Sequence, residues 1–407
     1  MLRRLTSLVL PLLLAGCAGT LPLTAQTTAS VPPTILVSID GFRPDYLDRG
    51  VTPHLNALAA EGARAAFMRP SFPSITFPNH TTLVTGLRPD HHGIVGNVME
   101  DPAIPGGFTL SNHAAVTDRR WWDEAEPIWV TAEKHGVHTG TMFWPGSEAA
   151  IHGVRPTYWQ PFDGTVSNDA RVDVVLGWLD KPAAQRPRFL TLYFDKVDHE
   201  GHLHGPQSGE VTQAAADVDE AIGRLVDGLA ARHAAANIVI VSDHGMADVS
   251  AARVIRIDQV APAGSYRVVV AGPYAGIAPT PGHDADLASA LLAPHDHMQC
   301  WRKGDVPARL AYGKNPRVPP FICLADVGWL ISENGTGGET KNLGAHGFDN
   351  AAPEMHATFI AEGPSIRAGV TLPGFDNVDV YPFVMRLIGV PALPSDGDIA
   401  PLVGALK

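Results

Sequence analysis

Short apolar runs that end at a carboxylate constrain the fold of this chain more than any other feature. They lie at residues 34–40, 188–195 and 237–243, and a similar run without the carboxylate lies at 140–144. Runs that are apolar throughout are typical of strands buried on both faces of a parallel sheet. Between them, residues 210–231 repeat apolar side chains every three or four positions, which predicts a helix packed on a sheet. We therefore expect an α/β fold with a mostly parallel sheet flanked by helices.

The N-terminal segment indicates export. Basic residues precede an apolar run that is too short to span a bilayer, so residues 1–17 are predicted to be a signal peptide. Its end, Leu-Ala-Gly-Cys, resembles a bacterial lipobox in which Cys17 would be lipidated; cleavage at small residues further on is the alternative. Residues 18–33, rich in Thr, Ala and Pro, predict a flexible tether. We expect a periplasmic or outer-membrane-anchored lipoprotein that meets the membrane through its lipid alone.

The remaining chain is predicted to form one domain with an insertion. Residues 34–248 and 341–407 carry the strand and helix patterns, whereas proline and glycine are frequent across 249–340, which is typical of an inserted capping region. Cys300 and Cys323 lie in this insertion and are the two cysteines that remain beyond Cys17. In an exported protein they can form a disulfide, and two buried free thiols are the alternative.

The charge balance excludes one class of partner. The net charge of the 407 residues is −12, whereas binding to a nucleic-acid duplex calls for a basic face. A small anionic substrate remains compatible with this charge if bound cations supply positive charge locally.

Carboxylates and histidines follow the predicted strands. Asp40, Asp198 and Asp243 stand at or just beyond strand ends, which meet at one edge of an open α/β sheet. His202 follows Asp198 by four residues, so one helical turn would place both side chains on the same face. Two further histidines complete the set of candidate ligands: His244 and His346.

This donor set predicts a pair of metal ions. Aspartate and histidine without cysteine suit zinc, with manganese as a chemical alternative. Two such ions can clamp the attacking and leaving oxygens of a displacement at phosphorus. Thr76, in the sequence PSITFPNH, supplies a hydroxyl that metal coordination would turn into a nucleophile.

Seven motifs in sequence order carry a family resemblance over residues 35–364. They are SIDGFRPDYL, TPHLNALAAEG, PSFPSITFPNHTTLVTGLRPDHHGIVGN, WPGSE, YFDKVDHEGHLHGP, VSDHGM and GAHGFDN. The set resembles the nucleotide pyrophosphatase/phosphodiesterase family of the alkaline phosphatase superfamily, in a bacterial member. The resemblance implies an alkaline-phosphatase-like core and two Zn²⁺ per chain. It also implies hydrolysis of nucleotide phosphodiesters to nucleoside monophosphates through a phosphothreonine-type intermediate.

The resemblance also assigns individual roles. One metal would be held by four residues and the other by three: Asp40, Thr76, Asp243 and His244; and Asp198, His202 and His346. Asn97 would donate a hydrogen bond to a phosphoryl oxygen, together with the backbone N–H of Phe77. Phe77 and Tyr193 would form aromatic walls around a nucleobase, and Tyr158 would close the same pocket.

Other functions remain open at this level. A choline-phospholipid phosphodiesterase would use the same metals, and an aromatic pocket also suits a quaternary ammonium group. A phosphomonoesterase or sulfatase fits less well, because residues 76–80 read TFPNH, without the arginine of the C/S-x-P-x-R pattern of sulfatases. A lipoprotein that binds without catalysis would not require the intact nucleophile and ligands. We expect a monomer acting on a small nucleotide or other diester.

Overall fold

The computed structural model describes residues 2, 31–336 and 341–407. The predicted signal peptide, Cys17 and most of the predicted tether therefore lie outside the described residues, apart from Leu2 and residues 31–33. Among the described helices, none combines the length and the apolar character needed to cross a bilayer.

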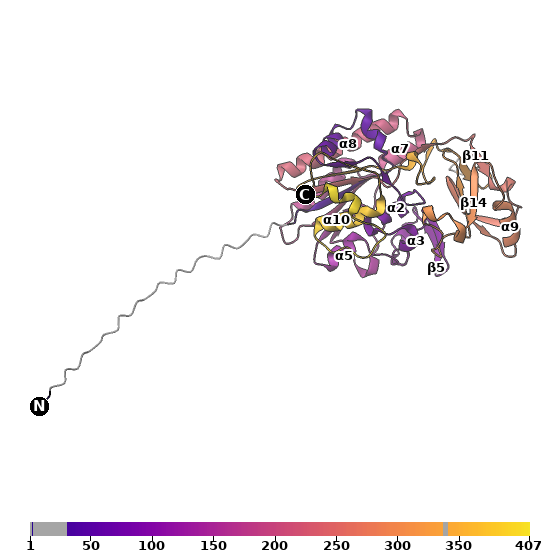
Figure 1. Cartoon of the computed structure of the whole chain (residues 1–407), viewed down its shortest axis with the longest axis horizontal. Coiled ribbons are helices and arrows are strands. Elements are labelled where there is room, and N and C mark those ends of the chain that lie inside the picture. The colour runs from indigo at the N-terminus through magenta and orange to yellow at the C-terminus, as the bar shows by residue number, and fades with distance from the viewer. Residues whose placement is uncertain (1, 3–30, 337–340) are drawn as a thin grey trace. The chain divides into compact units, whose positions relative to one another are not determined.

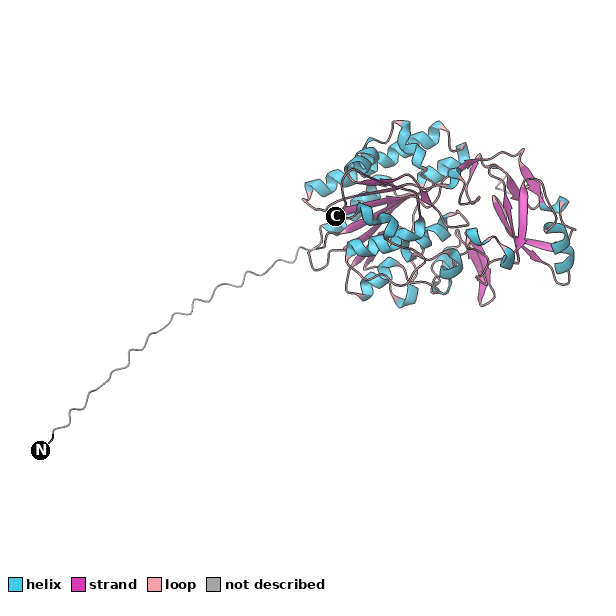
Figure 2. Ribbon diagram, in the orientation of Figure 1, coloured by secondary structure: helices cyan, strands magenta, loops and turns pink. Residues whose placement is uncertain are grey.

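An eight-stranded sheet forms the centre of the fold (Figures 1 and 2). Its strands, in spatial order, are β19 (Val370–Leu372), β2 (Ala63–Ala65), β18 (Phe359–Glu362), β9 (Asn237–Val241), β1 (Thr34–Ile39), β8 (Phe189–Phe194), β6 (Thr139–Met142) and β7 (Tyr158–Trp159). Within this sheet β18 runs antiparallel to both of its neighbours, and the other pairings are parallel. The prediction of a mostly parallel α/β sheet is confirmed.

Helices cover both faces of this sheet. Alternate side chains of β1 point to opposite faces, and because both sets are apolar, both faces are buried against helices. Ile35, Val37 and Ile39 join one apolar cluster, and Leu36 joins another. The first cluster includes α1 (Pro53–Glu61), α6 (Asn168–Leu179) and α8 (Gly209–Ala231). The second includes α2 (Thr76–Thr85), α5 (Ile128–Lys134) and α10 (Val380–Ile388). Figure 1 shows α8 on one side of the sheet and α5 and α10 on the other.

Helix α8 illustrates how the sequence sets one of these elements. Ser208 precedes its first turn and accepts a hydrogen bond from the backbone N–H of Val211, which is an N-cap. Apolar residues at the predicted spacing form its buried stripe, including Val211, Val218, Ile222 and Leu225. The helix begins and ends within one residue of the predicted range.

Short elements connect the layers. They are β3 (Met68–Arg69), α3 (Pro89–His92), β4 (Val98–Asp101), β5 (Ile104–Thr109), α4 (His113–Val116), α7 (Lys196–His204), β10 (Ala247–Asp248), β11 (Val254–Arg256), β16 (Leu330–Ser332), β17 (Gly344–Ala345) and β20 (Phe375–Asp376). Among them, α7 carries the predicted site residues Asp198 and His202. The turn that follows β9 of the main sheet carries Asp243 and His244.

A second, antiparallel sheet lies within the segment predicted to be an insertion. Its order is β12 (Tyr266–Val270), β13 (Tyr274–Pro279), β15 (Phe321–Ala325) and β14 (Met298–Arg302), with α9 (Asp284–Leu291) packed nearby. Cys300 and Cys323 face each other across β14 and β15 and form the expected disulfide. Strands β10 and β17 pair at the two ends of this segment. Residues 31–407 form one compact unit, and a capping role for residues 249–340 stays a prediction.

His92 makes the stability of this fold sensitive to acid. It is fully buried on α3, where its Nδ1 accepts a hydrogen bond from the N–H of Ile94 and its Nε2 pairs with Thr82 Oγ1. Burial lowers the pKa of His92 from 6.5 to about 3. As the pH falls through 6.5, His92 becomes protonated in the unfolded chain but stays neutral in the folded chain. The free energy of unfolding therefore decreases between pH 6.5 and about 3.

We predict that His92→Asn weakens this pH dependence, because asparagine keeps an acceptor for Ile94 and does not titrate. Between pH 7 and 5 the unfolding free energy of the wild type should fall by about 2 kcal/mol more than that of the variant. Urea unfolding at the two pH values measures the difference. Equal losses in both proteins would show that folding does not lower the pKa of His92.

Candidate functional site

A cavity of about 590 Å³ opens at the edge of the main sheet where β1 and β8 end. Most of the predicted site residues line it, from Asp40, Thr76, Phe77 and Asn97 to Tyr193, Asp198, His202 and His346. Asp243 and His244 are fully buried, and His244 Nε2 lies 3.3 Å from Thr76 Oγ1. The structure thus brings every predicted metal ligand to one place.

Strand ends and helix starts position these side chains. Asp40 directly follows β1, and Asp243 lies two residues beyond β9. Asp198 and His202 share α7, one turn apart, as the four-residue spacing predicts. Thr76 is the first residue of α2, so its hydroxyl lies where the helix dipole favours negative charge.

The three predicted histidine ligands have the same hydrogen-bond pattern. In each ring Nδ1 faces a backbone carbonyl, which can only accept, so Nδ1 carries a proton and Nε2 is the nitrogen that faces the site. The three contacts are His202 to Gly344 O at 2.9 Å, His244 to Gly245 O at 2.9 Å and His346 to Ser74 O at 3.1 Å. Second partners of this kind are typical of histidines that ligate metals. The Nε2 atoms of His202 and His346 lie 3.0 Å apart.

The Nε2 atoms of these three histidines point at carboxylates, and the side chains fall into two adjoining groups. His244 Nε2 lies 3.0 Å from Asp243 Oδ2 and 3.4 Å from Asp40 Oδ1. His346 Nε2 lies 3.4 Å from Asp198 Oδ1, and His202 Nε2 lies 3.5 Å from Asp198 Oδ2.

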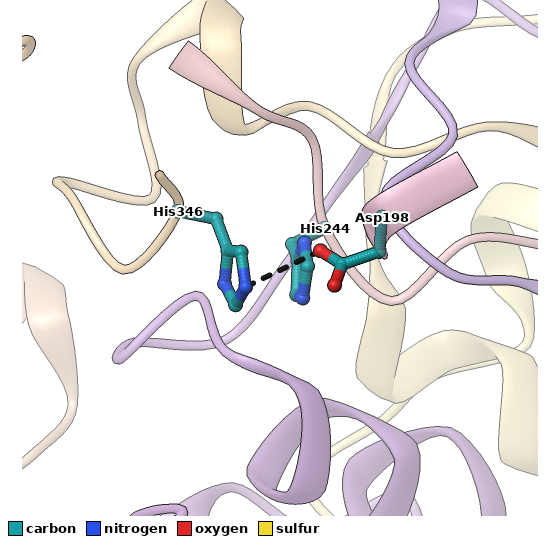
Figure 3. Close-up of side chains that lie close together, drawn as sticks. All are labelled: Asp198, His244 and His346. Carbon is teal, nitrogen blue, oxygen red and sulfur yellow. Dashed lines mark ion pairs between the residues drawn. The ribbon is translucent and has the colours of Figure 1, made fainter. Parts of the chain in front are cut away.

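The two groups meet at a pair of imidazoles. The rings of His244 and His346 stack with centroids 3.5 Å apart. Figure 3 shows the two rings beside the carboxylate of Asp198. By the distances between ligand atoms alone, His244 would share a metal ion with Asp198 and His346. The family resemblance instead assigns His244 to the metal held by Asp40 and Asp243. We favour the second grouping because His244 Nε2 is closer to Asp243, and because Thr76 Oγ1 shares that position.

Unpartnered oxygens show that this site suits cations. One oxygen of each aspartate, namely Asp40 Oδ1, Asp198 Oδ1 and Asp243 Oδ2, is buried without a hydrogen-bond partner. A buried carboxylate oxygen without a partner is costly, and a bound divalent ion would satisfy it. Three carboxylates and three imidazoles match the ligand preferences of zinc. The residues present therefore fit the metal that the resemblance implies.

Burial and mutual repulsion shift the protonation of these groups. Burial, together with the nearby charges of Asp243 and Asp198, raises the pKa of Asp40 well above its usual range. Burial, together with His244 and His202, holds the pKa of His346 well below its usual range. His346 is therefore neutral, which is the form that ligates a metal.

Asn97 and Phe77 are hydrogen-bonded to each other, which bears on the prediction that both donate to a phosphoryl oxygen. The backbone N–H of Phe77 donates to Asn97 Oδ1 at 3.0 Å, so in this state it orients the amide rather than facing the cavity as a free donor. The Nδ2 group of Asn97 is then left as the donor for a ligand in the cavity it lines.

The two predicted tyrosine walls lie differently from expectation. Tyr193 lines the cavity, but its hydroxyl donates to Asp40 Oδ2 at 2.6 Å. Tyr158 does not line this cavity; its ring stacks on Trp178 and its hydroxyl donates to the carbonyl of Gln185. Tyr158 belongs to the short edge strand β7, so the expectation that it closes the pocket is wrong.

Several apolar residues that were not predicted as site residues line the cavity, and two of them are well exposed. Phe162 and Leu110 are about half exposed there, at 50% and 48%. Phe162 is held by its backbone N–H, which donates to Glu148 Oε1 of the WPGSE motif at 3.1 Å. In the sequence QPFDG, Phe162 is an isolated aromatic residue among turn-forming residues, and this was the one feature that could have indicated a pocket residue.

Comparison with known proteins agrees with this site. The family model "Type I phosphodiesterase / nucleotide pyrophosphatase" matches residues 34–349. The chain belongs to this family. Its members are phosphodiesterase and pyrophosphatase hydrolases, and the family resemblance is confirmed.

Individual relatives span most of the chain. An uncharacterized pyrophosphatase/phosphodiesterase of Schizosaccharomyces pombe is 39% identical over 89% of this chain and 78% of its own length. Bis(5'-adenosyl)-triphosphatase enpp4 of Xenopus laevis is 35% identical over 92% of this chain and 81% of its own. The solved structure of murine ectonucleotide pyrophosphatase/phosphodiesterase 5, an inactive threonine-to-alanine variant in complex with AMP, has a TM-score of 0.88. It is 35% identical and covers 92% of this chain and 100% of that one.

We predict that removing metal inactivates this hydrolase and that zinc restores its activity. Asp198→Asn and His202→Ala should each lower the zinc content from about two ions per chain toward one, because each removes a donor of one group. His199→Ala is the matched control: His199 is the exposed neighbour of Asp198 and lines a different cavity. Elemental analysis of dialysed protein measures the content. A greater loss in His199→Ala than in His202→Ala would contradict the ligand assignment.

Proposed function

We propose that this protein is a two-zinc phosphodiesterase and nucleotide pyrophosphatase that converts nucleotide phosphodiesters to nucleoside monophosphates. The observation that carries the proposal is the position of the Thr76 hydroxyl. It lies at the start of α2, lines the cavity, and is 3.3 Å from Nε2 of His244, beside the unpartnered oxygens of Asp40 and Asp243.

The proposed reaction has two displacements at phosphorus. Bound zinc would lower the pKa of the Thr76 hydroxyl and offset the phosphoryl charge. The Thr76 hydroxyl then gives its proton to solvent, Oγ1 attacks phosphorus, and the leaving oxygen departs with the electron pair of its broken bond, so the phosphoryl group is carried on Thr76. Water next gives a proton to solvent and attacks the same phosphorus. The bond to Thr76 Oγ1 breaks, the monophosphate is released, and Oγ1 regains a proton. Asn97 Nδ2 donates to a phosphoryl oxygen during both steps.

The relatives support a nucleotide as the substrate. The murine structure holds AMP in a variant described as inactive, and that variant replaces a threonine with alanine. The Xenopus relative is named as a hydrolase of a dinucleoside triphosphate. The cavity here has the matching apolar character, because Phe77, Phe162 and Leu110 line it.

The same wall would also accept a quaternary ammonium group, so a choline phosphodiester is the second candidate substrate. We further propose that the protein is exported and anchored through Cys17, on the strength of the lipobox-like sequence at residues 14–17.

We predict that Thr76→Ala abolishes diester hydrolysis while the zinc content stays near two ions per chain. The remaining aspartate and histidine ligands still hold the metals, but the nucleophile is gone. Thr76→Ser, which keeps a hydroxyl, is the control and should retain turnover. Activity of Thr76→Ala within tenfold of the wild type would rule out the covalent route.

We predict that Phe77→Ala lowers kcat/KM for a nucleotide p-nitrophenyl ester by about 10–100-fold and barely changes that for a methyl p-nitrophenyl phosphate diester. Stacking of a base on an aromatic ring contributes about 1–3 kcal/mol, and the methyl ester has no base. A panel that adds a p-nitrophenyl monoester, a sulfate ester and a choline phosphodiester tests the function itself. Preference for the choline ester or the monoester would overturn the proposed substrate class.

A further inference from the structure

His80, in the TFPNH sequence, is a fully buried histidine beside the proposed metal site that the proposed mechanism does not use. Its Nδ1 lies 2.9 Å from the carbonyl oxygen of Thr76, and its Nε2 lies 2.9 Å from Ser38 Oγ. Because a carbonyl only accepts, Nδ1 carries the proton and Nε2 accepts from the Ser38 hydroxyl. Both ring nitrogens of His80 are therefore occupied.

This pattern separates His80 from the metal ligands. Its Nδ1 comes within 3.4 Å of Asp243 Oδ2, and proximity groups it with Asp40 and Asp243 as a possible metal holder. The Nε2 of a metal ligand must face the metal site, and His244 Nε2 faces Asp243, Asp40 and Thr76, whereas His80 Nε2 is turned away to Ser38. His80 instead ties the first residue of α2 to β1, two residues before Asp40.

Tyr193 holds the neighbouring carboxylate from the other side. It lies opposite Ser38 in the β1–β8 register, and its hydroxyl donates to Asp40 Oδ2 at 2.6 Å. That bond engages one oxygen and leaves the unpartnered Oδ1 turned toward His244 Nε2, 3.4 Å away. The rings of His80 and Tyr193 pack edge to face with centroids 5.2 Å apart.

We infer that His80 and Tyr193 are a pair of positioning residues that fix Thr76 and Asp40 relative to each other. Tyr193 acts on metal affinity through Asp40, rather than chiefly as a wall for the base. His80 acts on turnover, by holding the backbone of Thr76 against β1. This inference rests on the proposed two-metal site, and it assigns to Tyr193 a role different from the one that the resemblance suggested.

Tyr193→Phe tests the first half, because it removes the hydroxyl and keeps the ring. Competition with a chromophoric chelator should show zinc affinity at one site lowered by about 10–100-fold, as is usual when a partner of a ligand is lost. At saturating zinc, KM for a nucleotide p-nitrophenyl ester should be unchanged. Phe162→Ala is the matched control: it removes a cavity wall and should raise KM while leaving zinc affinity at the wild-type value.

Ser38→Ala tests the second half without altering His80 itself. Loss of the hydroxyl frees the His80 ring, so kcat should fall by about 10–100-fold while KM and zinc content stay constant, since small misplacements of a nucleophile are costly. Thr34→Val is the control, because Thr34 is a buried hydroxyl at the opposite end of the same strand. An equal fall in kcat for both variants would reduce the role of Ser38 to general stability and would overturn this half.

The outcomes separate this inference from the proposed function. If Tyr193→Phe bound zinc with the same affinity as the wild type, the Tyr193 hydroxyl would not support Asp40, and the inference alone would be overturned. A wild-type protein that binds no zinc would overturn the metal site, and the inference with it.

Discussion

Repulsion among three carboxylates, two of them buried and one partly buried, is the constraint on which the site depends. Asp40, Asp198 and Asp243 lie close enough that the charges of the other two help raise the pKa of Asp40. Each keeps one oxygen without a hydrogen-bond partner. Such a cluster is unfavourable unless positive charge offsets it. Burial lowers the pKa of His244, but the neighbouring Asp243 carboxylate more than offsets this and raises that pKa above its ordinary value. Bound divalent cations would supply further positive charge. The protein is therefore arranged to hold positive charge at the spot where a phosphoryl group would sit.

The sheet makes this concentration of charge possible. Because β1, β8 and β9 run parallel as neighbours, the segments that follow them emerge at one edge, and residues 40, 198 and 243 converge there. Helices on both faces exclude water from the strands, and α2 begins at Thr76 beside the same edge. The rigid layers thus place the nucleophile and the ligands, whereas the loops that carry Phe162 and Leu110 shape the cavity entrance.

Much of this arrangement could be predicted from the sequence, and the limits have physical causes. The strands around Val37, Leu192 and Ile240 were predictable because apolar runs of that length have few alternatives, and the strand-end aspartates followed from them. The hydrogen-bond partners of individual side chains could not be predicted, because they depend on the register in which the strands pair. Tyr193 faces Asp40 only because β8 pairs with β1 in one particular alignment.

The residues of the cavity wall were mispredicted for a related reason, because their positions depend on tertiary structure rather than on sequence spacing. Tyr158 is near the WPGSE motif in sequence but turns toward Trp178, while Phe162, four residues later, reaches the cavity from a loop without a periodic pattern. Sequence spacing fixes side-chain direction within a helix or strand and loses that power in loops. The double role of Asn97, which is held by the N–H of Phe77, likewise depended on a tertiary contact.

The central claim is that two zinc ions occupy this edge of the sheet. Diffraction from zinc-loaded crystals, collected above and below the zinc absorption edge, tests it most directly. The account predicts two anomalous peaks about 4 Å apart, one among Asp40, Thr76, Asp243 and His244 and one among Asp198, His202 and His346. A single peak, or a peak bound to His80, would contradict it.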